Sequence, residues 1–213
     1  MGMVIEQRTL TNDRLVVERS SESGSKTTTI RGYGAVFYRG TPETEFKIWD
    51  DMVERIMPEA FDRALKEKDD VRALFNHDPS MVLGRRSAET LKLSTDNIGL
   101  LYEIPTGDTT VARDLIEHLR RKDISGSSFS FRTTDEDFRR ENGVIIREIR
   151  GVELFDVGPV TFPAYEATTA GVRGVEGRGE ALAARERFLL QERVRKAKSM
   201  AMDLRVAEIE TGA

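Results

Sequence analysis

The chain between residues 27 and 162 consists largely of short runs rich in β-branched and aromatic residues, separated by turn-forming residues. Runs of this kind favour strands. An Asn-Gly pair at residues 142–143 indicates a tight hairpin between two of them. So many short strands predict a mainly antiparallel fold, either a barrel or a sandwich. The predicted strands cover residues 27–38, 71–75, 81–85, 90–93, 99–104, 124–132, 144–149 and 152–162.

Two short helices are predicted among these strands. Pro58 begins the first, because a proline in the first helical turn loses no intrahelical hydrogen bond. The second is predicted over residues 109–121, where apolar side chains fall on one face. We therefore expect an α+β fold in which the helices pack outside the strands.

The composition of the chain changes after residue 170. Four glycines at positions 171, 174, 177 and 179 indicate a flexible linker over residues 171–180. From Ala181 to about Glu208 the sequence contains no proline or glycine and is highly charged, which predicts one long helix. The predicted organisation is a domain over residues 1–170, the linker, and a charged helical extension over residues 181–213.

Apolar residues recur along this predicted helix with the spacing of a heptad repeat. They are Leu190, Val194, Ala197, Ala201 and Leu204. The stripe permits two interpretations, because the helix could lie on the surface of its own domain or could form a coiled-coil arm. Such an arm would serve self-association or the docking of a partner, although small alanines weaken its seam.

Composition limits the possible functions. The 213 residues are 38% hydrophobic and 33% charged, as expected of a soluble globular protein. The formal net charge of -4 gives no general electrostatic reason to bind nucleic acid, and no specific nucleic acid partner is expected. No apolar run approaches the roughly 20 residues that cross a bilayer, and the first residues lack a secretory pattern. We therefore expect synthesis in the cytoplasm and no membrane partner.

Cysteine is absent, which excludes disulfides, thiol nucleophiles and cysteine-based metal sites. The chain has two histidines, His77 and His118, so a metal site with three histidine ligands is impossible. We expect no metal and no other cofactor. His118 lies on a predicted helix beside two arginines, where a solvated position is expected.

Serine and phenylalanine alternate over residues 124–131. On a strand this pattern directs Phe129 and Phe131 into the core and Ser128 to the opposite face. His77 follows an apolar strand and precedes an Asp-Pro turn, as is typical of the rim of a sheet. A serine hydroxyl attacks a carbonyl only with a base, usually a neutral imidazole. Ser128 and His77 are therefore candidates, and a polar strand face with a rim histidine is the alternative.

The order of these residues disfavours the common serine hydrolases. Residues 126–130 nearly match the nucleophile elbow Gly-x-Ser-x-Gly, but that fold has its histidine after the serine, and none follows Ser128. The Gly-Asp-Ser-Gly stretch of chymotrypsin-like enzymes is absent. An esterase of small substrates is disfavoured for the same reasons.

Six segments of the chain occur in the order found in one protein family. Each segment is weak evidence alone, but six in order are specific. They are GYGAVF at 32–37, IMPEAF at 56–61, FNHD at 75–78, VLGR at 82–85, ISGSSF at 124–129 and LFDVGPVTFPA at 154–164. From about residue 30 to residue 171 the chain resembles the tailed-phage prohead (capsid maturation) serine proteases, a family similar to the herpesvirus assemblins.

The resemblance implies a role for both candidate residues. The histidine of the Asn-His-Asp stretch is His77, and the nucleophile of the family falls on Ser128. Ser127 stands where the family usually has methionine, and Ser130 stands where it has a second glycine. The resemblance further implies a closed, mainly antiparallel β-barrel surrounded by helices.

A third group is expected to orient the imidazole of His77. Family members often carry a glutamate at the position of Gly151, which leaves Glu148, Glu153 and Asp156 as candidate acids. Glu153 shares a strand face with Gly151, whereas Asp156 has the opposite parity unless a β-bulge intervenes. A dyad of serine and histidine alone is the remaining alternative.

The resemblance implies a serine endopeptidase that acts inside the assembling prohead, in the host cytoplasm. Its partners would be the major capsid protein and the scaffold region of that protein, which it would cleave. Self-cleavage is expected in the linker or in the C-terminal helix, and dimerisation is implied by analogy with assemblins. The alternative is a non-catalytic assembly factor whose charged helix binds capsid subunits as a scaffold.

Overall fold

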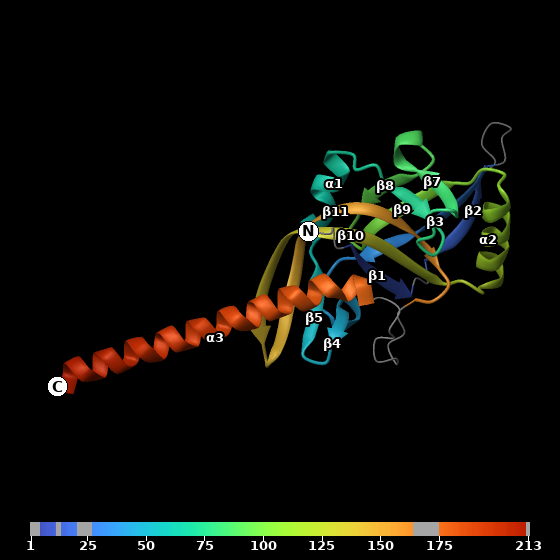
Figure 1. Cartoon of the computed structure of the whole chain (residues 1–213). Helices are drawn as coiled ribbons and strands as arrows, with labels where there is room; N and C mark the ends of the chain where they lie inside the picture. Colours follow the sequence, from blue (N-terminus) through green and yellow to red (C-terminus); the bar gives the residue numbers. More distant parts are fainter. Residues whose placement is uncertain (1–4, 12–13, 21–26, 164–174, 212–213) are drawn as a thin grey trace.

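The computed structural model describes residues 5–11, 14–20, 27–163 and 175–211 (Figure 1). Within these residues the strands form a seven-stranded and a four-stranded sheet. The strands are β1 (Glu6–Thr11), β2 (Val16–Ser20), β3 (Thr27–Val36), β4 (Phe46–Trp49), β5 (Met52–Ile56), β6 (Arg72–Leu74), β7 (Val82–Arg85), β8 (Lys92–Thr95), β9 (Gly99–Pro105), β10 (Gly126–Glu141) and β11 (Val144–Val160). The helices are α1 (Asp62–Lys66), α2 (Thr110–Arg121) and α3 (Val175–Thr211), and the short 3-10 turns are η2 (Pro42–Thr44), η3 (Pro58–Phe61) and η4 (Arg86–Ala88).

The prediction of a closed β-barrel is wrong, although the broader α+β class agrees with the structure. The larger sheet has the order β1-β10-β11-β5-β4, and no pairing among the described residues joins its two ends. Closure requires the last strand to pair with the first. One edge of β11 pairs with β10, but its other edge is divided between β5, at residues 145–149, and β6, at residues 156–157. The sheet therefore branches at β11 and stays open.

The two sheets share one hydrophobic core. Phe129 and Phe131 of β10 stack in it with ring centroids 4.8 Å apart, as the alternating pattern predicts. On the other side of the core, β3 of the smaller sheet approaches β11 closely, since a Cβ at Gly34 would lie 3.2 Å from Val157 Cγ1. Helix α2 adds Leu115 to the same core. The core thus begins directly behind the strand that carries Ser128.

Several local predictions are confirmed. Helix α2 begins beside Thr109, whose side chain accepts a hydrogen bond from the N–H of Ala112 at 3.2 Å. Asn142 and Gly143 have φ of 49° and 86°, as a two-residue hairpin turn requires, and they join β10 to β11. The strands predicted over 144–149 and 152–162, however, form the single strand β11.

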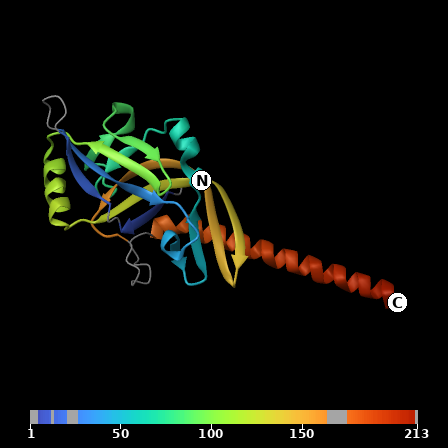
Figure 2. The same cartoon turned by 180° about the vertical axis from the view of Figure 1, so that it is seen from behind.

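Helix α3 packs on the body through its first turns and then extends away from it (Figures 1 and 2). Ala181 and Ala184 are buried, and Phe188 stacks on Phe138 of β10 at 5.4 Å. The helix begins at Val175, and residues 171–174 of the predicted linker lie outside the described residues. Among the described helices, none is long and apolar enough to span a membrane.

Gly158 permits the close approach of β6 to β11, and we predict that alanine there is destabilising. A Cβ at Gly158 would lie 2.0 Å from the carbonyl oxygen of Leu74, so the two backbones would have to separate. We expect Gly158→Ala to lower the free energy of unfolding by about 2 kcal/mol or more, measured by urea unfolding. Gly107→Ala, where a Cβ would meet open space, is the control. Equal stability of the two variants would contradict this account.

Candidate active site

His77 lies on a sharp turn that directly follows β6. Asn76 and His77 both have positive φ, 56° and 58°. Asparagine tolerates this conformation better than most residues, and histidine adopts it less often than the right-handed regions, so other contacts must hold the turn. The N–H of Asn76 donates to the carbonyl of Pro159 at 3.0 Å, and its side chain exchanges hydrogen bonds with Thr161 at 3.0 and 2.8 Å. The histidine is thereby attached to the end of β11.

Ser128 lies within β10, opposite Gly158 of β11. Its Oγ lies 2.6 Å from Nε2 of His77. The other ring nitrogen of His77, Nδ1, lies 2.5 Å from Oδ1 of Asp156 in β11. Ser128 is fully buried, whereas the side chains of His77 and Asp156 keep 15% and 13% exposure. The structure therefore brings a hydroxyl, an imidazole and a carboxylate into continuous contact.

A β-bulge in β11 brings Asp156 to this face of the sheet. Ser130 pairs with Asp156 while the next residue of β10, Phe131, pairs with Leu154, so Phe155 is the extra residue. The bulge reverses the alternation of side chains beyond it. The sequence pattern placed Asp156 on the same face as Glu153 only if a β-bulge lay between them. The structure contains that bulge.

The other two candidate acids have arginine partners. Glu153 forms an ion pair with Arg132 across the strands. Glu148 pairs with Arg139 and Arg150. Burial opposes ionisation of Glu148, but the hydrogen bonds from Arg150 and Arg139 hold the pKa of this carboxyl below its ordinary value. Of the three candidate acids, Asp156 is therefore the one in contact with the imidazole.

Ser127 and Ser128 point to opposite faces of β10. The hydroxyl of Ser127 lies 2.8 Å from the hydroxyl of Tyr102 in β9, and both side chains are buried between the sheets. Burial raises the pKa of Tyr102, so the phenol is neutral and this contact joins two neutral hydroxyls. The register therefore distinguishes the two adjacent serines, and Ser128 is the one beside His77.

Two contacts at the site were missed by the sequence analysis. The hydroxyl of Ser130 donates to the second carboxylate oxygen of Asp156, and the Ser-x-Ser alternation could have indicated a shared role with Ser128. The backbone carbonyl of Arg8 accepts a hydrogen bond from Ser128 Oγ at 2.9 Å. Arg8 belongs to β1, whose mostly polar sequence gives little strand signal.

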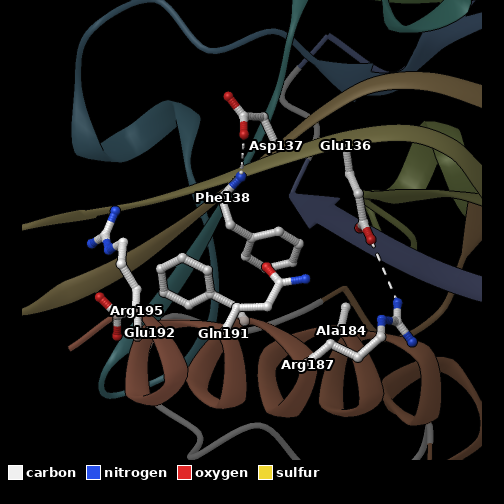
Figure 3. Close-up of a pocket in the computed structure, with 9 residues that line it drawn as sticks. Glu136, Asp137, Phe138, Ala184, Arg187, Gln191, Glu192 and Arg195 are labelled. Carbon is white, nitrogen blue, oxygen red and sulfur yellow. Dashed lines mark hydrogen bonds and ion pairs between the residues drawn. The ribbon is translucent and has the colours of Figure 1, made fainter. Parts of the chain in front are cut away.

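Two further features, His118 and a pocket beside α3, take no part in the contact between Ser128 and His77. His118 is about half exposed and pairs with Asp123 at 3.1 Å, in agreement with the solvated position predicted for it. The pocket in Figure 3 lies between β10 and α3, so it is separate from the contact of Ser128 with His77. It is lined by Glu136, Asp137, Phe138, Ala184, Arg187, Phe188, Gln191, Glu192 and Arg195.

The arrangement is chemically able to activate a hydroxyl. If the carboxylate of Asp156 accepts the Nδ1–H of His77, the Nε2 lone pair faces Ser128 and can remove its proton. A serine that loses its proton during attack is a competent nucleophile toward a carbonyl carbon.

Comparison with known proteins agrees with this geometry. Residues 15–179 match the model of the caudovirus prohead serine proteases. The chain belongs to this family. The resemblance seen in the sequence is thereby confirmed, and membership identifies a serine protease of bacteriophage capsid maturation.

Solved structures contain a similar fold. The capsid assembly protease of bacteriophage T4 aligns with a TM-score of 0.50 and 11% identity, over 75% of this chain and 98% of that one. At such low identity the similarity shows the fold alone. No curated protein sequence matches the chain significantly.

Asp156 and Glu153 provide a matched pair of substitutions. We predict that Asp156→Asn slows peptide-bond cleavage by about a hundredfold or more, because an amide no longer selects the required imidazole tautomer. Glu153→Gln removes a charge on the same sheet face but breaks only the pair with Arg132, so near-normal cleavage is expected. Initial rates of cleavage measure both. Equal losses in the two variants would contradict the assignment.

Proposed function

We propose that the protein is a serine endopeptidase of prohead maturation in which Ser128 is the nucleophile, His77 the general base and Asp156 the orienting acid. The observation that carries this proposal is the continuous contact from Ser128 through the imidazole to Asp156. Membership of a serine protease family supports the same chemistry.

The proposed reaction follows from this contact. His77 Nε2 removes the proton of Ser128 as Oγ attacks the substrate carbonyl carbon, and the imidazolium then donates that proton to the leaving amine. In the second half of the reaction, His77 removes a proton from a water molecule as that water attacks the acyl carbon, and it returns the proton to Ser128 Oγ as the acyl bond breaks. Asp156 stabilises the imidazolium, and the hydroxyl of Ser130 holds the carboxylate in place. Glu148 and Glu153 have no part in this mechanism.

The proposed substrates are scaffold segments of capsid proteins, above all the scaffold region of the major capsid protein. The similar T4 protein is a capsid assembly protease, which supports this choice of partner. We place the reaction inside the prohead, in the host cytoplasm, where enclosure raises the local concentration of substrate. Self-cleavage in the segment over residues 171–180 or in α3 belongs to the same proposal.

Co-expression with the cognate capsid protein tests this function. We expect mass spectrometry to detect truncated capsid protein with the wild type, and none with Ser128→Ala or His77→Ala. Ser127→Ala is the control, because its hydroxyl contacts Tyr102 and not the imidazole. The intact mass of the protease itself, compared with that of Ser128→Ala, reports self-cleavage.

The opposite result has a definite meaning. Truncation that survives Ser128→Ala and His77→Ala, or that never occurs, would reject the catalytic proposal. The non-catalytic scaffolding role would then be the better account, because α3 has a highly charged sequence and extends from the body (Figure 1).

Helix α3 supports a second proposal, that two copies associate through its outer part. Leu190 and Val194 of the heptad-like stripe are 61% and 46% exposed, beyond the turns that pack on the body. The side chain of Leu204, which continues the stripe, lies outside the described residues. A coiled coil with a second copy would bury these apolar side chains.

We predict that Leu190→Glu combined with Val194→Glu abolishes self-association, because two carboxylates would enter the seam. Sedimentation velocity measures the oligomeric state. Gln191→Glu combined with Ser199→Glu adds two carboxylates to exposed positions outside the stripe and should leave association unchanged. If both double variants sediment like the wild type, α3 does not mediate self-association.

A further inference from the structure

Strand β1 occupies the edge of β10 beside the serine of the candidate site. It pairs antiparallel with β10 from Glu6, opposite Phe131, to Thr11, opposite Gly126, and so runs past Ser128. Ser128 is fully buried, and its Oγ lies 2.9 Å from the carbonyl oxygen of Arg8 in this strand. The family match begins at residue 15, so β1 precedes the part of the chain that the family model describes. While β1 is paired there, no other strand can pair with this edge of β10.

The contact with β1 also affects the chemistry of the hydroxyl. Ser128 has a single hydroxyl hydrogen and two acceptors within reach of its Oγ, the carbonyl oxygen of Arg8 at 2.9 Å and Nε2 of His77 at 2.6 Å. General-base catalysis requires the same hydrogen to point toward Nε2 of His77. The carbonyl of Arg8 therefore competes with the base for the proton that must be removed.

Buried charges hold β1 on the sheet. Arg8 donates to Glu54 of β5 at 2.6 and 2.8 Å. Arg147 of β11 donates to Glu6 at 2.7 and 3.0 Å. Burial opposes ionisation of Glu6, but the bonds from Arg147 and the charge of Arg8 lower the pKa of this carboxyl, so it is an anion. Glu6, Glu54 and Arg147 are fully buried, and Arg8 is nearly so.

The ion pairs of this cluster are arranged so that β1 can leave without an unpaired charge remaining buried. Glu6 and Arg8 of β1 pair with each other at 2.7 Å and would depart as a neutral pair. Glu54 and Arg147, which remain, pair at 2.8 Å. An unpaired buried charge is the main penalty for breaking such a cluster, and it is avoided here. Among the described residues of β1, Leu10 is the one apolar side chain, and it is only partly buried.

We propose that β1 is an inhibitory strand that occupies the substrate position on β10, and that the enzyme becomes active when β1 leaves. A substrate segment then adds to the vacated edge of β10 as an extended strand, with its carbonyl beside Ser128. The activation part of this inference rests on the catalytic roles proposed above, but the covering of Ser128 does not.

Access to position 128 can be measured without catalysis. The chain contains no cysteine, so Ser128→Cys introduces a single thiol into the full-length protein. Its reaction with dithiobis-nitrobenzoate, compared with the same chain unfolded in guanidinium, measures how far β1 protects this position. We expect strong protection in the folded protein.

Arg8→Met, added to Ser128→Cys, should release β1. In this variant, two buried carboxylates, Glu6 and Glu54, would share the positive charge of Arg147 as long as β1 stays paired. This arrangement is unfavourable, and it ends when β1 leaves and Glu6 returns to water. We expect the thiol to react about tenfold faster or more, equivalent to about 1.4 kcal/mol. Arg55→Met is the matched control, because Arg55 is 8% exposed against 6% for Arg8, and its partners Glu45 and Glu141 lie outside β1.

A fluorophosphonate probe, which labels activated serines, tests whether the departure of β1 activates the enzyme. This experiment uses proteins that retain Ser128. Labelling should be faster with Arg8→Met than with the wild type or Arg55→Met, and it should disappear when His77→Ala is added. If the thiol becomes accessible but Ser128 is not labelled, the blocking role of β1 is supported and the catalytic assignment is overturned.

Two results would overturn the proposal that β1 blocks access to position 128. One is a thiol in Ser128→Cys that reacts as fast as in the unfolded chain, or that Arg8→Met accelerates no more than Arg55→Met. The other needs no destabilising variant: hydrogen exchange of the β1 amides measures how often β1 opens, and thiol reaction faster than this opening contradicts the proposal.

Discussion

The pairing of β11 with its neighbours is the constraint on which the whole site depends. The antiparallel pair with β10 sets Ser128 opposite Gly158, and the bulge at Phe155 turns Asp156 toward the same face. The absence of a side chain at Gly158 lets β6 approach, and Asn76 attaches the next turn to the end of β11. One strand thus positions all three polar groups, so an error in its register would separate them.

The N-terminal strand joins the same sheet by a different kind of force. Most of the described molecule is held by an apolar core between two sheets, whereas β1 is held by main-chain pairing and a buried cluster of acids and arginines. Paired buried charges contribute little net stability because their desolvation offsets their attraction. Such a cluster specifies where β1 lies without binding it as tightly as an apolar face would. This combination suits a segment that must protect a reactive group and later leave it.

Local patterns were sufficient for several elements. The hairpin at Asn142 and Gly143 and the helix capped by Thr109 follow from rules that act over a few residues. The alternation of serine with phenylalanine assigned Ser128 and Phe129 to opposite faces, because side chains on a strand alternate. The closed barrel that the family resemblance implied is wrong, because closure depends on which strands pair at the far edge of β11, and local patterns do not specify that pairing.

The sequence by itself determined the residue types available for chemistry, since a chain with two histidines and no cysteine offers few bases and nucleophiles. Its ordered motifs also pointed to His77 and Ser128. Only the tertiary structure decided which acid meets the imidazole, because a single bulged residue moves Asp156 across the sheet. It also revealed that β1 pairs beside the serine, because the partners of Glu6 and Arg8 lie as far as 141 residues away in the chain. Contacts between such distant residues leave no local pattern.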